Sequence, residues 1–212
     1  MVTQLQVPTD VSDTNGKIHT RQDELVTGPS RIDVEFSTEP AHPAGNIALI
    51  GLRVTLGFLF FWAFLDKTFG LGYATPSANA WIRGGSPTKG FLSGANVGPL
   101  QGFFRAIAGV PGMDWLFMIG LLGIGLSFLL GVALRPAAIS GTLLVVLMWF
   151  ATWPPATSAG GQATSSTNPV IDEHILEAFA MIVIAVFAGK TAGYLGRRWA
   201  NLEIVQRFPW LR

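Results

Sequence analysis

The run WLFMIGLLGIGLSFLLGVAL, residues 115–134, contains no charged side chain over 20 consecutive positions. A helix rises about 1.5 Å per residue and the hydrocarbon core of a bilayer is about 30 Å thick, so about 20 apolar residues are enough to cross it. Apolar runs of this length are uncommon in the buried helices of soluble domains. The run therefore predicts a transmembrane helix.

Three further segments approach this length and apolar character, and 50% of the whole chain is hydrophobic while 13% is charged. This composition predicts an all-α membrane protein: a four-transmembrane-helix bundle with a polar N-terminal arm and a long extracytoplasmic loop after the first helix. The predicted helices span residues 47–67, 114–134, 136–153 and 169–189. Glycines on the second and third helices are expected to let backbones approach closely in lipid. They are Gly120, Gly123, Gly125, Gly131 and Gly141.

The distribution of Lys and Arg predicts the orientation of these helices. An even number of crossings places both termini on one side of the membrane. That side holds nine Lys and Arg residues and the other side holds four, with Arg53 inside the first helix. Because cytoplasmic loops carry an excess of positive charge, we expect a multi-pass protein of the cell membrane with both termini in the cytoplasm.

Polar or irregular segments flank the predicted helices of the membrane domain, residues 46–199. Residues 1–45 contain seven acidic and three basic side chains, and such a cytoplasmic arm is expected to be either solvated or ordered against a partner subunit. Residues 200–212 form a basic C-terminal tail. The Gly- and Pro-rich loop at 70–99 belongs to a class that is usually functional, disordered or partner-binding. Residues 100–108, LQGFFRAIA, are expected to form a short interfacial helix.

Ionisable side chains gather where the first predicted helix ends and the fourth begins. Asp66 and Lys67 end the first helix, at about the depth where the fourth helix carries Asp172, His174 and Glu177. His174 and Glu177 are three residues apart and can share a helix face. Lys67 is the expected cation for that face.

The start of the fourth helix also has a structural explanation. Asn168 can cap this helix, Pro169 suits its first turn, and acidic groups there complement the helix dipole, which accounts for Asp172 and Glu173. Glu177 follows that cap by nine residues, or about 13 Å along the helix, where a lipid-facing charge costs a few kcal/mol. We therefore expect Glu177 to face the bundle interior and to be paired or protonated.

Two interpretations of the charged cluster remain open. A carboxylate beside a histidine can bind a quinol headgroup or relay protons, since both groups can titrate near neutral pH once burial shifts them. The candidate residues for a quinone or proton site are Lys67, Asp172, His174 and Glu177. The same groups can instead form structural ion pairs. Arg53 and Asp66 are interpreted as structural polar positions, with Arg53 snorkelling or packing near the cytoplasmic end.

The chain has no cysteine and three histidines, two of them in the arm. These counts exclude thiolate-ligated iron–sulfur clusters, covalent haem attachment and disulfides within this chain, and they argue against a bis-histidine haem or a zinc or copper site with several imidazoles. We predict no metal site and no catalytic residue. We expect no cofactor bound by this chain alone, while a quinone or a lipid at the bundle surface remains compatible with the pattern.

Four stretches together resemble the DoxX/DoxD family over residues 46–199. They are LRVTLGFLFFWAFLDK at 52–67, AWIRGGSPTKGFLSG at 80–94, MIGLLGIGLSFLLGVALRPAAISG at 118–141 and NPVIDEHILEA at 168–178. Members with this loop are similar to the DoxD-type small subunit of thiosulfate:quinone oxidoreductase, a four-helix membrane protein. The resemblance implies that Arg53, Lys67, Asp172 and His174 fall on polar positions of the family.

The resemblance and the missing cofactor ligands favour an integral membrane accessory subunit of a respiratory or redox complex, non-catalytic and supporting assembly or stability. Its expected partners are other membrane subunits and lipids, with no role for nucleic acid. The alternative is a quinone-interacting small subunit of a thiosulfate:quinone oxidoreductase, with thiosulfate oxidised on another subunit. A small-solute transporter is a weaker alternative, because no helix shows the broken pattern or paired repeats of carriers.

Overall fold

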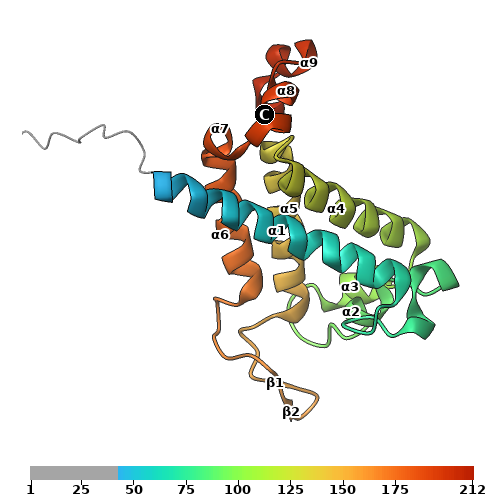
Figure 1. Cartoon of the computed structure of the whole chain (residues 1–212). Coiled ribbons are helices and arrows are strands. Elements are labelled where there is room, and N and C mark those ends of the chain that lie inside the picture. The colour runs from blue at the N-terminus through green and yellow to red at the C-terminus, as the bar shows by residue number, and fades with distance from the viewer. Residues whose placement is uncertain (1–42) are drawn as a thin grey trace, which may run out of the picture. The chain divides into compact units, whose positions relative to one another are not determined.

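Three helices are long and apolar enough to cross a membrane: α1 (Pro43–Phe69), α4 (Pro111–Leu130) and α5 (Leu134–Thr152). The structure is a computed structural model that describes residues 43–212, which lie in one compact, mostly helical unit (Figure 1). The predicted helices at 47–67, 114–134 and 136–153 are therefore confirmed, with shifted ends. The predicted arm lies almost wholly outside the described residues.

The turn between the second and third predicted helices begins earlier than expected. Gly131 caps α4 in the left-handed conformation, with a φ of 74°, and Ala133 precedes α5 with a φ of 50°. Because a left-handed residue ends the helical hydrogen-bond ladder, α4 stops at Leu130 instead of continuing to residue 134. Pro136 then falls within the first turn of α5, where its missing N–H removes no helical hydrogen bond.

The fourth predicted helix is wrong in its bounds and in its cap. The side chain of Asn168 accepts hydrogen bonds from the backbone N–H groups of Val170 and Ile171, both at 2.9 Å, which makes a turn rather than a helix start. Asp172 is the N-cap of α6 (Glu173–Val186), and its Oδ1 accepts from the N–H of Ile175 at 3.2 Å. With 14 residues, α6 is about 21 Å long, shorter than a bilayer core.

The helices α1, α4, α5 and α6 pack in a closed ring, in which α1 and α5 each contact both α4 and α6. Figure 1 shows α1 and α4 side by side, with the neighbouring helices α5 and α6 running across the direction of α1. The largest side chains buried between them include Phe60, Met118, Phe128 and Met181. The ring therefore has one continuous apolar core.

Two glycines set the close approach of α1 to α4. A Cβ on Gly57 would lie 2.6 Å from the backbone nitrogen of Leu129, and a Cβ on Gly125 would lie 2.7 Å from that of Phe61. Since lipid supplies no hydrophobic drive for helix association, this backbone contact provides van der Waals attraction that a larger residue would prevent. The pairing of early with late positions shows that α1 and α4 run antiparallel.

The other predicted glycines divide into two groups. Gly131 lies against the carbonyl group of Ala192, and Gly141 lies against the sulfur of Met181, so both are packing positions as predicted. The prediction is wrong for two positions where an added Cβ would meet no atom within 4 Å, namely Gly120 and Gly123.

The segment between α1 and α4 contains four short helices, and the last two, with α5, enclose a small second core. They are η1 (Ser77–Asn79), η2 (Trp81–Arg83), α2 (Lys89–Leu92) and α3 (Gln101–Ile107). The predicted helix at 100–108 is confirmed as α3, and its Phe104 is buried with Ala95 and Ala151. A hairpin of β1 (Ser158–Ala159) and β2 (Gln162–Ala163) connects α5 to α6.

The chain after α6 folds back onto the start of α5. It forms α7 (Ala188–Thr191), α8 (Gly193–Ala200), α9 (Glu203–Arg207) and η3 (Pro209–Leu211). The backbone N–H of Arg135 donates to the carbonyl of Arg212 at 3.0 Å, and its Nη1 donates to the carbonyl of Pro209 at 3.1 Å. The basic tail therefore lies at the end of the ring where α5 begins.

Candidate functional site

Asp66, near the end of α1, holds the first part of the α1–α4 connection, residues 70–110. Its side chain is only 2% exposed. One carboxylate oxygen accepts from the backbone N–H of Tyr73 at 3.2 Å and the other from that of Ala74 at 3.0 Å. Because these bonds satisfy a buried charge with main-chain donors, the geometry gives Asp66 a structural role.

Asp114, in the first turn of α4, holds the second part and was missed as a site residue from sequence. Its Oδ1 accepts from the backbone N–H of Thr88 at 3.0 Å, the hydroxyl of Thr88 at 2.6 Å and the hydroxyl of Ser86 at 2.9 Å. The Thr88 hydroxyl in turn accepts from the N–H of Gly109 at 3.1 Å. The sequence signal that could have indicated Asp114 is the SPT motif at residues 86–88, because its two hydroxyl groups need a hydrogen-bond acceptor when they are buried.

Arg53, about three turns into α1, joins this helix to the end of α4. Its Nη1 donates to the carbonyl oxygens of Phe128 and Leu129, the latter at 3.0 Å, and the residue is 7% exposed. The last carbonyls of a helix lack partners within that helix, and the negative end of its dipole favours a cation. Arg53 therefore packs against α4. Of the two structural interpretations given for it, snorkelling and packing, the geometry corresponds to packing.

The start of α6 carries a hydrogen-bonded acid and histidine. Nδ1 of His174 lies 2.9 Å from Oδ2 of Asp172, while Oδ1 of Asp172 caps the helix. His174 is buried, and Glu177 is half-buried one turn further along. Measured from Asp172, Glu177 is five residues into the helix, or about 7.5 Å. The predicted depth of about 13 Å is wrong because the cap is Asp172 and not Asn168.

Lys67 does not join this group. Its Nζ lies 6.0 Å from the centroid of the Phe117 ring on α4. Among residues 43–212, the one ion pair within 4.0 Å is that of Asp172 with His174, so Lys67 does not provide the expected cation for Glu177. The six predicted residues therefore lie in three places: Arg53 against α4, Asp66 with Lys67 at the end of α1, and the remaining three at the cap and in the first turns of α6.

Asp172, Glu173 and His174 each place a potential ligand atom within 4.8 Å of the others. A metal ion there would compete with existing hydrogen bonds, because both Asp172 oxygens and Nδ1 of His174 are already engaged. Glu173 is exposed, which leaves it and Nε2 of His174 as the ready donors. The arrangement favours a helix cap with an oriented histidine over a metal centre.

A cavity of about 340 Å³ lies between the α1–α4 connection and the helices α4 and α5. Its walls include the rings of Phe91, Phe103 and Phe117. Both hydroxyl groups in its wall already donate elsewhere, that of Thr88 to Asp114 and that of Ser140 to backbone carbonyls. The cavity therefore suits hydrocarbon and offers little recognition to a polar headgroup.

No protein family, curated protein or solved structure matches this chain. The roles of these side chains therefore follow from their geometry. Arg53, Asp66 and Asp114 each link a helix to a neighbouring segment by hydrogen bonds. His174 and Glu177 form an ionisable pair whose positions are not explained by a link of this kind.

Proposed function

We propose that this chain is an integral membrane accessory subunit of a multi-subunit respiratory or redox complex, and that it supports assembly or stability. The observation that carries the proposal is the use of its buried charges. Arg53, Asp66 and Asp114 each bind main-chain groups of another segment. Buried polar groups that bind the main chain of another segment fix one arrangement of helices and loops. A scaffold for partner subunits requires such a fixed arrangement.

In this proposal α6 provides the fourth membrane crossing. Its support is the closed ring with α1, α4 and α5, together with apolar residues on both sides of the short helix. Val170 and Ile171 precede it and Phe187 follows it, all of them exposed. The crossing then extends beyond the 14 helical residues.

Both termini are proposed to lie in the cytoplasm of a plasma-membrane protein. Among the described residues, the segments at the start of α5 and after α6 carry six basic side chains and one acidic side chain, Glu203. The basic residues are Arg135, Lys190, Arg197, Arg198, Arg207 and Arg212. This excess is the charge bias expected of the cytoplasmic side.

The redox partner is proposed from the resemblance to the DoxX/DoxD family. In two of the motifs that carry this resemblance, a side chain makes a hydrogen bond that holds the fold together. The LDK motif contains Asp66, which holds the start of the α1–α4 connection, and the SPTKG motif contains Thr88, which binds Asp114. A motif that the chain has in common with the family, and that holds the fold together, favours a common fold. It does not by itself imply a common reaction.

The second candidate function is a quinone-interacting small subunit of a thiosulfate:quinone oxidoreductase. It is favoured by the buried His174, whose Nδ1 is held by Asp172 while Nε2 stays available for a headgroup oxygen. Reduction of a quinone to a quinol takes up two electrons and two protons. In this role thiosulfate, oxidised on a partner subunit, supplies the electrons, and His174 with Glu177 delivers protons.

Isolation in mild detergent through a tag on this chain tests the first proposal. We expect cofactor-bearing membrane subunits to accompany the chain in fixed stoichiometry, with characteristic haem or flavin absorption. An unrelated multi-pass protein with the same tag, isolated from the same cells, is the control. Recovery of the chain alone, from cells in which respiratory complexes are intact in that detergent, would contradict an accessory role.

Thiosulfate-dependent quinone reduction by the isolated assembly separates the two candidates. We expect no such activity above that of the control isolation if the chain is an accessory subunit. If activity is present, Glu177→Gln is compared with Glu203→Gln, which changes an exposed acid on α9. An intact assembly that loses turnover only in the Glu177 variant would favour the quinone role, and loss of the assembly itself would favour a structural role.

A further inference from the structure

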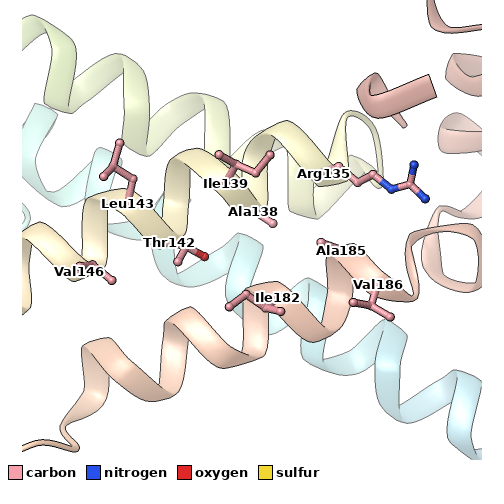
Figure 2. A pocket seen from close by; sticks show the side chains of 9 residues that line it. All are labelled: Arg135, Ala138, Ile139, Thr142, Leu143, Val146, Ile182, Ala185 and Val186. Carbon is pink, nitrogen blue, oxygen red and sulfur yellow. The ribbon is translucent and has the colours of Figure 1, made fainter. Parts of the chain in front are cut away.

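An open groove of about 770 Å³ runs between α5 and α6 on the outside of the ring. Figure 2 shows its walls, formed by Arg135, Ala138, Ile139, Thr142, Leu143 and Val146 of α5 and by Ile182, Ala185 and Val186 of α6. All but two of these side chains are hydrocarbon. Ile139 and Leu143 are 67% and 60% exposed, so the groove is accessible from the surrounding lipid.

The length of the groove fits one leaflet of a bilayer. Arg135 lies in the first turn of α5 and Val146 is eleven residues further along. At about 1.5 Å per residue this distance is about 16 Å, close to half of a hydrocarbon core about 30 Å thick. An acyl chain of the leaflet nearest Arg135 can therefore lie along the apolar walls.

The end of the groove carries a cation. Arg135 is exposed, and in Figure 2 its guanidinium points away from the apolar walls, beyond the end of α5. Nη1 donates to the carbonyl of Pro209, a neutral acceptor. Among the described residues no carboxylate lies within 4.0 Å of the guanidinium of Arg135. A guanidinium has five N–H donors and pairs well with phosphate, so it can bind a further anion.

We infer that this groove binds an anionic phospholipid, with its phosphate on Arg135 and one acyl chain between α5 and α6. Charge complementarity selects this occupant over another apolar helix. The five other basic side chains that follow α6 lie in segments beyond the same end of the groove. Basic pockets between membrane helices commonly hold acidic lipid headgroups. The site requires that α5 cross the membrane and is independent of any redox role.

Native mass spectrometry of the full chain in detergent tests this lipid site. Phosphatidylglycerol and phosphatidylcholine with identical acyl chains are added separately, and the bound fraction is measured for the wild type and for Arg135→Gln, Arg135→Lys and Arg207→Gln. We expect the wild type to retain phosphatidylglycerol preferentially and Arg135→Gln to bind it about tenfold more weakly. Arg135→Lys keeps most of the preference, and Arg207→Gln, the matched charge removal on α9, keeps all of it.

The apolar part of the groove is tested separately. Val186→Phe fills the groove at an exposed position and should weaken retention of both lipids, whereas Val183→Phe, on α6 outside the groove, should not. This pair remains informative if Arg135→Gln fails to fold. Equal retention of the two lipids by the wild type, or equal losses in the Arg135→Gln and Arg207→Gln variants, would overturn the site.

A second copy of the chain is the competing occupant. Since the chain has no cysteine, Ile139→Cys introduces a single thiol in the groove wall. Oxidation in membranes should leave the variant monomeric if lipid occupies the groove. Efficient disulfide-linked dimers, absent from the control variant Leu176→Cys on an exposed part of α6, would overturn the lipid assignment in favour of an interface between copies.

Discussion

Nη1 of Arg53 on α1 lies 3.0 Å from the carbonyl oxygen of Leu129 at the end of α4, and it also donates to Phe128. The backbones of the same two helices come close together at Gly57 and Gly125. Arg53 thus donates to carbonyl groups in the last turn of α4, which lack partners within that helix, and it does so where α1 packs against α4. The pairing explains why an arginine is buried well inside a helix that is long and apolar enough to cross a membrane.

Arg53→Met should destabilise the fold by about 2–4 kcal/mol, because charge-assisted hydrogen bonds are lost and buried carbonyls lose their donor. The unfolding transition of the purified chain in detergent measures this loss. Arg105→Met is the matched control, since Arg105 is exposed and donates to Gln101 on the same short helix. A transition for Arg53→Met that coincides with that of the control would show that the bonds to α4 contribute little.

Asp114→Ala should loosen the α1–α4 connection more than the ring. It leaves the N–H and hydroxyl of Thr88 without their acceptor, at a cost of about 2–4 kcal/mol. We expect faster amide exchange throughout residues 86–109, with the core of α5 unchanged. Ser86→Ala removes a single hydroxyl from the same acceptor and should have a much smaller effect. Uniform acceleration across all helices would instead place Asp114 in the global fold.

The apolar runs were sufficient to predict three of the long helices, because a length of about 20 residues is set directly by the bilayer. Their ends were less predictable, since a single backbone conformation decides them. Gly131 ends α4 because its φ is positive, a property that the apolar pattern does not reveal. At the fourth helix, both Asn168 and Asp172 are good caps by residue type, and the turn made by Asn168 decides between them.

The glycines on α4 provide a direct comparison of a contact position with an open one. Gly125→Ala places a methyl group against the backbone of Phe61 and should destabilise the fold by about 1–3 kcal/mol through overpacking. Gly123→Ala adds the same group to the same helix where no atom lies within 4 Å, and we expect a change within about 0.5 kcal/mol. Unfolding in a common detergent measures both variants. Equal transitions would mean that α1 shifts to accommodate the methyl group.

The candidate site was predictable in its residue types but not in its pairing. Spacing placed His174 and Glu177 on one face of a helix correctly, since both lie on α6. The predicted pairing of Lys67 with the acidic face of α6 is wrong, because two residues at equal depth in a bilayer can lie at different positions around the ring. Lys67 lies over Phe117 on α4, while α6 packs mainly against α5. The contribution of Asp114 required knowing that Thr88 folds back onto α4.

Asp172 combines two roles that substitutions can separate. Asparagine caps helices about as well as aspartate, so Asp172→Asn should keep the start of α6 while removing the negative charge beside His174. Asp172→Ala loses the cap as well and should cost about 1 kcal/mol more in the unfolding of the detergent-solubilised chain.

The functional readout of these variants distinguishes the two candidate functions. If the chain is an accessory subunit, the yield of the assembled complex should follow stability alone, so that Asp172→Asn behaves like the wild type and Asp172→Ala assembles less. If His174 binds a quinone, the orientation of its ring depends on Asp172, and Asp172→Asn should reduce quinone turnover per assembled complex without lowering assembly. Measuring both quantities on the same preparation makes the two roles separable, because a cap acts on the amount of complex and an oriented histidine acts on its rate.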